Sequence, residues 1–202
     1  MTKFSGEVAS FNTRTASKVR VISGKWRKRN IFFEATSGLR PSGDRVRETL
    51  FNWLSPSITG THCLDLFAGS GALSFEALSR GAKSCLAVDN NPRTIEWLRY
   101  NCEQLGVSSL ELLEADSSLL VKKHGGQPAD IVFMDPPFNG YPIGYLCQHL
   151  EVYNWLGAEA MIYIETPSQI TNYNTPTNWV LWRETLTGKV CSRLYTRIET
   201  VT

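Results

Sequence analysis

The chain has no apolar run that could cross a membrane, and it contains few residues that form cross-links or hold metals. A membrane span needs roughly 18 or more consecutive apolar residues, and none of the 202 residues lie in such a run. The 5 cysteines are an odd number without a C-x-x-C pair, and the 3 histidines share no ligand-like spacing. The first residues lack the charged-then-apolar pattern of an export signal. We therefore expect a cytoplasmic monomer with free thiols, no metal and no membrane anchor.

The chain also lacks internal repeats and low-complexity tracts, and its net charge is only +2. The charge is unevenly distributed, however. Residues 1–50 hold 11 Lys/Arg against 4 Asp/Glu, whereas residues 51–202 hold 10 against 15. With 42% hydrophobic residues, this length predicts one globular domain with a sizeable core and a basic N-terminal appendage.

The densest positive segment runs from Arg14 to Arg29, with seven basic residues and no acid. Residues 18–22 and 31–34 predict a short hairpin that presents these charges. Such a block, with Trp26 among the cations, suits a phosphate backbone and a stacked base. The alternatives are a solvated hairpin face and, for Trp26, packing of the hairpin onto the domain. The residues that we expect to contact nucleic acid here are Lys25, Trp26, Arg27, Lys28 and Arg29.

A helix is predicted after this segment, with Asp44 as its N-cap and an apolar stripe from Val46 to Leu54. Core packing explains the stripe but not the arginines around it. We therefore expect Arg40, Arg45 and Arg47 to offer their charge to the same nucleic-acid partner.

Four apolar runs follow, each with an aspartate in or just after it. Stretches between them have helical periodicity, and alternation of strand and helix predicts a mostly parallel, doubly wound α/β sheet. The predicted strands are 62–67, 85–88, 110–113 and 131–134, with two more within 178–198, and the predicted helices are 72–80, 92–105 and 117–123.

The segment Asp65-Leu66-Phe67-Ala68-Gly69-Ser70-Gly71 joins a predicted strand to a predicted helix. Its glycines allow a ligand close to the backbone, but the third glycine of a dinucleotide fingerprint is absent. Asp65 suits an ammonium better than a pyrophosphate. Asp89, 18 residues after Gly71, stands where a carboxylate reaches ribose hydroxyls. A ligand with a ribose, an adenine, an ammonium and no phosphate fits this pattern, which is the inventory of S-adenosylmethionine; the alternative for each acid is a helix cap or a solvated strand end.

The fourth run ends in Asp135-Pro136-Pro137-Phe138. Proline restricts its own φ and the residue before it, so a carboxylate and a backbone carbonyl are held side by side next to an aromatic ring. Two acceptors and a ring suit a planar group that carries an –NH₂. The alternative is a turn that ends a strand and has no chemistry.

With these motifs in view, the chain resembles the bacterial RsmD family, which methylates the exocyclic 2-amino group of a guanine in 16S ribosomal RNA. The resemblance is carried by residues 19–29 (VRVISGKWRKR), 40–54 (RPSGDRVRETLFNWL), 65–82 (DLFAGSGALSFEALSRGA) and 135–138 (DPPF). It implies a Rossmann-like class I methyltransferase fold with a mostly parallel seven-stranded sheet. Residues 1–55 would form a basic hairpin and helix extension, and residues 56–202 the methyltransferase domain.

The resemblance also assigns roles by position, with the assembled small ribosomal subunit as the partner. The base site maps to Asp135, Pro136 and Phe138. Cofactor contacts map to Asp65, Phe67, Gly69, Ser70, Gly71, Asp89, Asn90 and Asp116. Two other functions stay open: an amino-group methyltransferase on DNA or another RNA, and a non-catalytic RNA-binding assembly factor.

Overall fold

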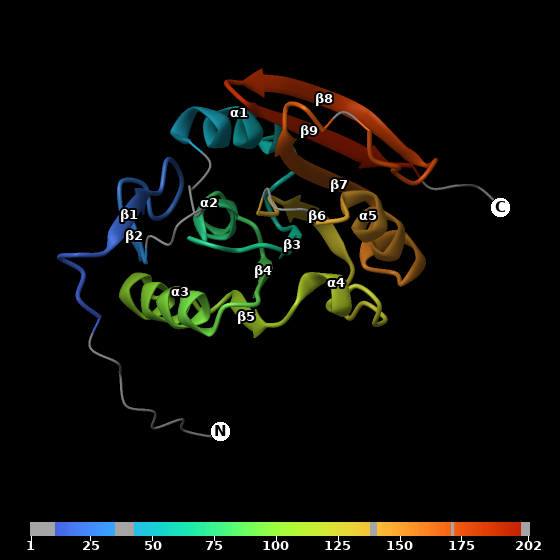
Figure 1. Ribbon diagram of the computed structural model, residues 1–202. Helices are drawn as coiled ribbons and strands as arrows, with labels where there is room; N and C mark the ends of the chain where they lie inside the picture. The colour runs from blue at the N-terminus through green and yellow to red at the C-terminus, as the bar shows by residue number, and fades with distance from the viewer. Residues whose placement is uncertain (1–10, 35–42, 138–140, 171, 199–202) are drawn as a thin grey trace.

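A seven-stranded sheet organises the protein in the computed structural model, which describes residues 11–34, 43–137, 141–170 and 172–198 (Figure 1). Its strand order is β5-β4-β3-β6-β7-β9-β8, and a two-stranded sheet of β1 and β2 lies beside it. The strands are β1 (Ser17–Arg20), β2 (Asn30–Phe33), β3 (His62–Asp65), β4 (Ser84–Asp89), β5 (Leu110–Glu114), β6 (Ala129–Met134), β7 (Leu156–Pro167), β8 (Trp179–Thr187) and β9 (Val190–Arg197). The helices are α1 (Asp44–Leu54), α2 (Ala72–Ser79), α3 (Pro92–Leu105), α4 (Ser117–Leu120) and α5 (Ile143–Val152).

Strands β3 to β7 run parallel, whereas β9 is antiparallel to both β7 and β8. The mostly parallel seven-stranded α/β sheet expected from the sequence is therefore confirmed. The chain reverses direction of winding between β3 and β6, which are neighbours in the sheet although five elements, α2, β4, α3, β5 and α4, separate them in sequence. In such sheets, ligands bind outside the carboxyl ends of the strands at this switch point.

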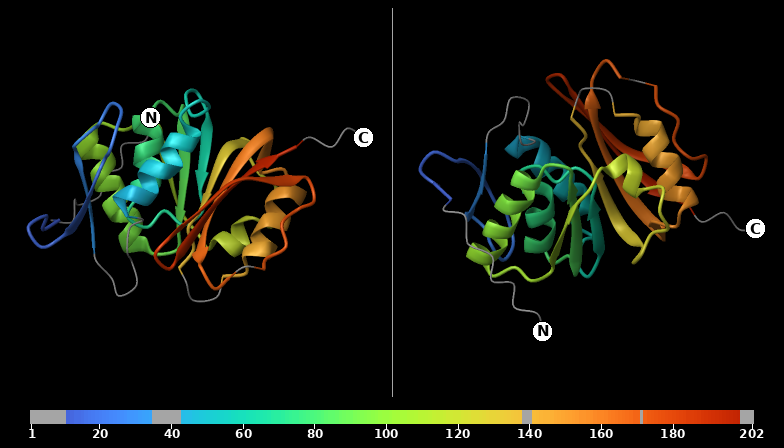
Figure 2. Two further views of the ribbon diagram at one scale, coloured as in Figure 1. Left: turned by 90° about the horizontal axis from the view of Figure 1, so that it is seen from above. Right: turned by 60° about the horizontal axis from the view of Figure 1, so that its bottom comes forward.

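Helices cover both faces of the sheet (Figure 2). One apolar cluster joins α1, α2 and α3 to one face through residues such as Phe51, Phe75 and Phe133. A second cluster joins α4 and α5 to the other face through residues such as Val132 and Leu146. The first cluster also contains Val19 and Ile31, so the hairpin packs into the same core as the sheet.

The local expectations hold best where cap and breaker signals are strong. Helix α3 spans the predicted residues 92–105, with the Asn91 side chain capping Arg93 N–H and Gly106 ending the helix at a φ of 64°. Helix α1 differs from expectation at its start. Gly43 is the N-cap, and Asp44 is the first helical residue, whose carboxylate accepts from Arg47 instead.

The predicted hairpin is present as the antiparallel pair β1–β2, with Ser17 opposite Phe33 and Arg20 opposite Asn30. The loop that joins β1 to β2 is held together at its base by two hydrogen bonds. Val21 N–H donates to the Arg29 carbonyl, and Lys28 N–H donates to the Val21 carbonyl. We call residues 22–29 the basic loop. It therefore has a defined backbone conformation although most of its side chains are exposed.

Candidate active site

Four aspartates lie at the carboxyl edge of the parallel strands. Asp65 and Asp89 are the last residues of β3 and β4, Asp116 follows β5 by two residues, and Asp135 follows β6 directly. Because these four strands are neighbours in the order β5-β4-β3-β6, the acids share one edge of the sheet. We call Asp65, Asp89 and Asp116 the acidic edge. Its continuation at Asp135 begins the Asp-Pro-Pro segment.

The glycine loop between β3 and α2 is held directly by the acidic edge. The Gly69 N–H donates to Asp89 Oδ2 at 2.9 Å, and Asp89 Oδ1 accepts from Asn91 N–H at 2.9 Å. Burial raises the pKa of the half-buried Asp89 carboxyl, and these two N–H groups partly oppose that rise. Asn90, which lies between Asp89 and Asn91 in the sequence, is exposed. The loop and the end of β4 are therefore one preformed unit.

Gly71 begins helix α2 in the left-handed conformation, at a φ of 78°. A Cβ at this position would lie 2.5 Å from Leu98 and 2.9 Å from Phe75, so only glycine fits. Ser70 is buried, and its hydroxyl accepts from Ala72 N–H at 3.3 Å. The tight turn therefore begins α2 directly after the glycine loop, the place where other sheets of this kind bind ligands.

Asp65 is the most buried member of the acidic edge, at 1% exposure. Its carboxylate accepts from the Ser74 hydroxyl at 2.6 Å and from Phe67 N–H at 3.4 Å. Burial raises the pKa of Asp65 to about 6, with a smaller rise from the negative charge of Asp89. A carboxylate that is desolvated in this way gains from a cationic ligand nearby.

Asp116 caps α4, accepting from the N–H groups of Ser118 and Leu119 and from the Ser118 hydroxyl. These bonds lower the pKa of its carboxyl. The helix-cap interpretation that the sequence left open is therefore correct for Asp116 in this structure. The cap still leaves it at the same edge as Asp89.

At the end of β6, Asp135 is partly exposed and Pro136 is buried. Strand β6 pairs in parallel with β7, and their last paired residues are Met134 and Ile164. Asp135 and Glu165 come directly after this pair, one on each chain segment. Glu165 is 3% exposed and accepts from the Tyr163 hydroxyl at 2.7 Å. This second carboxyl group was not predicted, because nothing in the local pattern of β7 marks Glu165 as lying beside Asp135. Phe138 lies outside the described residues.

Tyr141 is another residue that the sequence did not indicate. Its ring meets the Phe67 ring edge-on at 4.8 Å, which connects the segment after Asp-Pro-Pro to the glycine loop. Burial, followed by the charges of Asp116 and Asp89, raises the pKa of its hydroxyl. Tyr141 therefore lies close to the acidic edge, opposite the strand ends.

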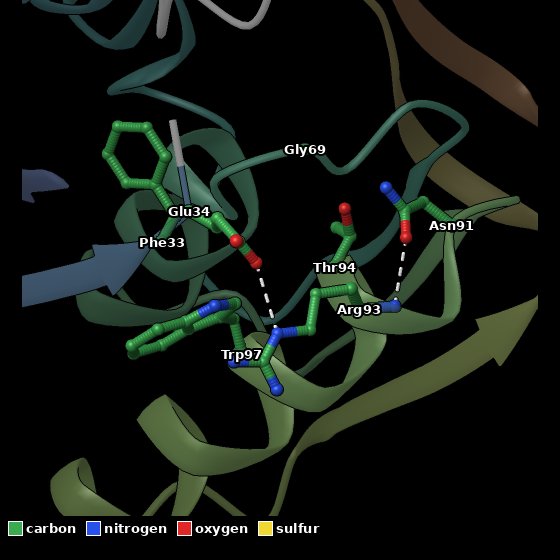
Figure 3. Close-up of a pocket in the computed structure, with 7 residues that line it drawn as sticks. All are labelled: Phe33, Glu34, Gly69, Asn91, Arg93, Thr94 and Trp97. Carbon is green, nitrogen blue, oxygen red and sulfur yellow. Dashed lines mark hydrogen bonds and ion pairs between the residues drawn. The ribbon is translucent and has the colours of Figure 1, made fainter. Parts of the chain in front are cut away.

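The hairpin also reaches this edge. Figure 3 shows a recess between the end of β2 and the start of α3, where Glu34 accepts from Arg93 Nε at 3.0 Å beside Gly69 and Asn91. Arg93 also donates to Glu96, at 2.8 Å. Trp97 forms the floor, and Phe11 packs on it with ring centroids 4.4 Å apart. The N-terminal extension thus borders the glycine loop as well as carrying the basic loop.

The basic loop is fixed to helix α2, the same helix that the glycine loop begins. Glu76 is fully buried and accepts from the N–H groups of Ile22 at 2.7 Å and Ser23 at 3.0 Å. Ser79 Oγ accepts from Trp26 N–H at 3.0 Å, and the Ser79 carbonyl accepts from Lys25 N–H at 2.8 Å. A Cβ on Gly24 would lie 1.8 Å from that carbonyl, so the close approach requires glycine. The exposed side chains that result are Lys25, Arg27, Lys28 and Arg29.

Two expected RNA contacts are corrected by burial. Trp26 is only 9% exposed and belongs to the apolar cluster under the hairpin, with Lys25 Nζ 5.1 Å from its ring. Its ring is packed rather than offered to a base. Arg47 is 0% exposed: it donates to the Arg20 carbonyl at 3.0 Å and to Asp44 at 2.7 Å, and lies 3.8 Å from Glu76.

The sequence contains part of the signal that Arg47 is buried. With Val46, Leu50 and Leu54 on the buried stripe, Arg47 sits beside them on the helix, and Phe51 four residues later is also buried. Arg45 remains exposed as expected. Arg40 lies outside the described residues.

The described ranges, residues 11–34, 43–137, 141–170 and 172–198, contain neither a metal cluster nor a membrane-spanning helix. No group of three or more His, Cys, Asp or Glu residues there could hold a metal ion. No helix in the same ranges is long and apolar enough to span a membrane. All 5 cysteines are free thiols; Cys102 is partly exposed and the others are buried.

The chain is similar in sequence to a protein family and to named relatives. The family model described as conserved hypothetical protein 95 matches residues 19–196. The chain is 41% identical over 187 residues to a protein of Escherichia coli named ribosomal RNA small subunit methyltransferase D, covering 92% of this chain and 93% of the relative. It is 44% identical to the protein of the same name from Haemophilus influenzae, covering 88% of this chain and 93% of the relative.

Solved structures agree with these sequence relationships. The Escherichia coli protein yhhF superimposes with a TM-score of 0.83 at 39% identity, over 91% of this chain and 100% of that one. The Haemophilus influenzae protein HI0767 gives a TM-score of 0.78 at 41% identity, again over 91% and 100%. The chain therefore belongs to the conserved hypothetical protein 95 family, together with the proteins named ribosomal RNA small subunit methyltransferase D.

Proposed function

We propose that this protein transfers a methyl group from S-adenosylmethionine to the exocyclic 2-amino group of a guanine in 16S ribosomal RNA. The observation that carries the proposal is the position of Asp135 and Pro136. They directly follow β6 at the switch point, beside the acidic edge and the glycine loop. An amine acceptor site and a site for a cationic nucleoside are thus adjacent. Because small ribosomal subunits are cytoplasmic, the proposed reaction is too.

The residues of the acidic edge fit S-adenosylmethionine by charge and by shape. Asp65 is a desolvated carboxylate whose raised pKa favours a nearby cation, and the ligand carries an ammonium and a sulfonium. Asp89, at the end of β4, is placed for ribose hydroxyls. Gly69, Ser70 and Gly71 allow close approach of the backbone, and Phe67 would border the ligand. When bound, the cofactor supplies an electrophilic methyl group on its sulfonium.

The chemistry at Asp135 follows from the poor nucleophilicity of a guanine amine, whose lone pair is delocalised into the ring. The Asp135 carboxylate and the Pro136 carbonyl would each accept one amine proton. Two such bonds favour a pyramidal nitrogen and free its lone pair for in-line attack. Holding the reactants in this alignment contributes roughly 7–11 kcal/mol to lowering the barrier. Asp135 is also placed to take the proton that the amine loses. Phe138 would stack on the extruded guanine.

The basic loop is the proposed RNA-binding element. Lys25, Arg27, Lys28 and Arg29 are exposed on a backbone that Glu76 and Ser79 hold in place, and Arg45 adds a further exposed cation on α1. Rigid presentation of charge suits a structured phosphate backbone such as that of an assembled subunit.

The deciding experiment uses small ribosomal subunits from a strain that lacks the methyltransferase. Incubation with the protein and tritiated S-adenosylmethionine should label the 16S RNA, and nucleoside analysis should find N2-methylguanine. Label in another base or only in DNA would favour an amino-group methyltransferase of different substrate. Binding of subunits without label would favour a non-catalytic assembly factor.

A further inference from the structure

A second recess lies on the opposite side of Asp-Pro-Pro from the basic loop. It is about 310 Å³ in volume, at the lower end of the range of small-ligand sites. Tyrosines form much of its wall: Tyr141 and Tyr145 at the start of α5, and Tyr173 after β7. Ile170 and Asn172 complete the side that faces them. In Figures 1 and 2, α5 and the β1–β2 hairpin lie on opposite flanks of the central strands.

The tyrosines of this recess are held by contacts behind them. The Tyr173 hydroxyl lies 3.2 Å from that of Tyr195 and accepts from Arg193, whose guanidinium also lies 5.6 Å from the ring. The Tyr145 ring stacks on His149 with centroids 3.8 Å apart. These rings are therefore held in place, and the rings of Tyr141 and Tyr173 are the candidates for contact with a base.

Polar features point to the kind of ligand. The Lys122 ammonium lies 5.6 Å from the Tyr145 ring and is exposed at the end of α4. None of the residues that line the recess is acidic. Aromatic platforms with a neighbouring cation are how proteins bind unpaired nucleotides.

One residue of the recess also contacts the glycine loop. Tyr141 lines it and at the same time contacts Phe67 of the glycine loop. When one base is extruded from its stack, its neighbours lose stacking partners and become available to aromatic side chains. A nucleotide next to the extruded guanine would reach this recess.

We propose that the recess binds the base of an unpaired nucleotide that adjoins the target guanine, with that nucleotide's phosphate near Lys122. This rests on the proposed function and extends the substrate surface to both flanks of Asp135. The basic loop holds the phosphate backbone on one flank. The tyrosine recess holds a base on the other.

Cross-linking tests the placement directly. The full-length protein with Ile170→p-benzoylphenylalanine is bound to unmethylated small subunits and irradiated, and the cross-link is mapped by reverse transcription. We expect the stop at a nucleotide immediately beside the guanine that the parent protein methylates. A cross-link to a ribosomal protein, or to a distant part of the RNA, would overturn the proposal.

Kinetics separate this proposal from the function on which it rests. Ile170→Trp, which fills the recess, and Lys122→Ala should each raise KM for subunits, by about 5- to 100-fold for the filled recess. The affinity for S-adenosylmethionine should stay unchanged. Lys83→Ala is the matched control, since Lys83 is exposed and directly precedes β4, at the amino end of that strand and away from the carboxyl ends. Unchanged KM in both recess variants would sink the recess alone, whereas no methyl transfer by the parent protein would sink the function.

Discussion

The two ends of helix α2 serve regions of opposite charge. At its start, the glycine loop is bonded to the acidic edge, where Asp65 is desolvated and Asp89 is half-buried. At its last turns, Glu76 and Ser79 hold the backbone of the basic loop, whose cations face solvent. The short helix therefore connects the acidic edge and the basic loop directly.

The acidic edge and the basic loop differ in which of their groups are buried. At the acidic edge, burial raises the pKa of the Asp65 and Asp89 carboxyls, whereas hydrogen bonds lower the pKa of Asp116. A desolvated carboxylate favours a positively charged ligand nearby. The basic loop buries the backbone and the acid that anchors it, and leaves the charges of Lys25 and Arg27 exposed. Under the proposed function, charge in the first region would select a small cationic ligand, and charge in the second would bind RNA.

The largest effect is expected at Asp135, where the two regions would meet over one substrate. Asp135→Ala should reduce kcat by about 10²- to 10³-fold, equivalent to roughly 3–4 kcal/mol, because the carboxylate acts on the amine in the transition state. Cofactor affinity should stay unchanged. Single-turnover methylation of subunits measures the effect, with Asp130→Ala, at the other end of β6, as the control. A rate close to that of the parent would remove Asp135 from the mechanism.

Next in size is the contrast between two arginines of α1. Arg47→Ala should lower the free energy of unfolding by about 3 kcal/mol, since it removes a fully buried cation beside the buried Glu76, together with its bond to the exposed Asp44. Arg45→Ala, two residues earlier and exposed, should change it by no more than about 0.5 kcal/mol. Urea denaturation of both variants provides the measurement. Equal destabilisation would mean that burial does not separate their roles.

The basic loop should affect substrate binding without affecting the acidic edge. Replacing Lys25, Arg27, Lys28 and Arg29 together by Ala should weaken subunit binding at least about tenfold. The slope of log affinity against log salt should fall by roughly 3, from 0.7–0.9 per lost phosphate contact. Filter binding at several salt concentrations tests both expectations. The loop would have no role in binding if the variant kept the affinity and the slope of the parent.

Asp89 provides the reciprocal test. Asp89→Ala should weaken cofactor binding about tenfold, because it removes the proposed ribose acceptor and the partner of Gly69 N–H. Calorimetry with S-adenosylmethionine measures this, and subunit binding should be unaltered. Glu103→Ala, an exposed acid at the far end of α3, is the control. Unchanged cofactor affinity in Asp89→Ala would refute the assignment.

The smallest effect is a pH dependence of cofactor affinity. Asp65 has a raised pKa of about 6, so the group is ionised above that pH and neutral below it. A cationic ligand prefers the ionised form, so affinity should be full near pH 7.5 and fall several-fold by pH 5. The Asp65→Asn variant should bind more weakly and show a flatter profile. A parent affinity that rises toward pH 5 would contradict the role of this carboxylate.

Sequence alone determined the features that depend on neighbours along the chain. Helix α3 was predicted to its first and last residue because Pro92 and Gly106 mark its ends, and the acids at the strand ends followed from their spacing after apolar runs. Tertiary structure decided what depends on distant residues. From the sequence, Arg47 is expected to offer its charge to RNA and Trp26 its ring to a base. In the structure, Arg47 is buried beside Glu76, and Trp26 is buried in the apolar cluster under the hairpin. Glu165 and Tyr141 have no local signal, because only pairing of β7 with β6 and packing against Phe67 bring them to the site. Burial is set by the sum of contacts across the fold, so a side chain's exposure and partners become known only when the strands are in register.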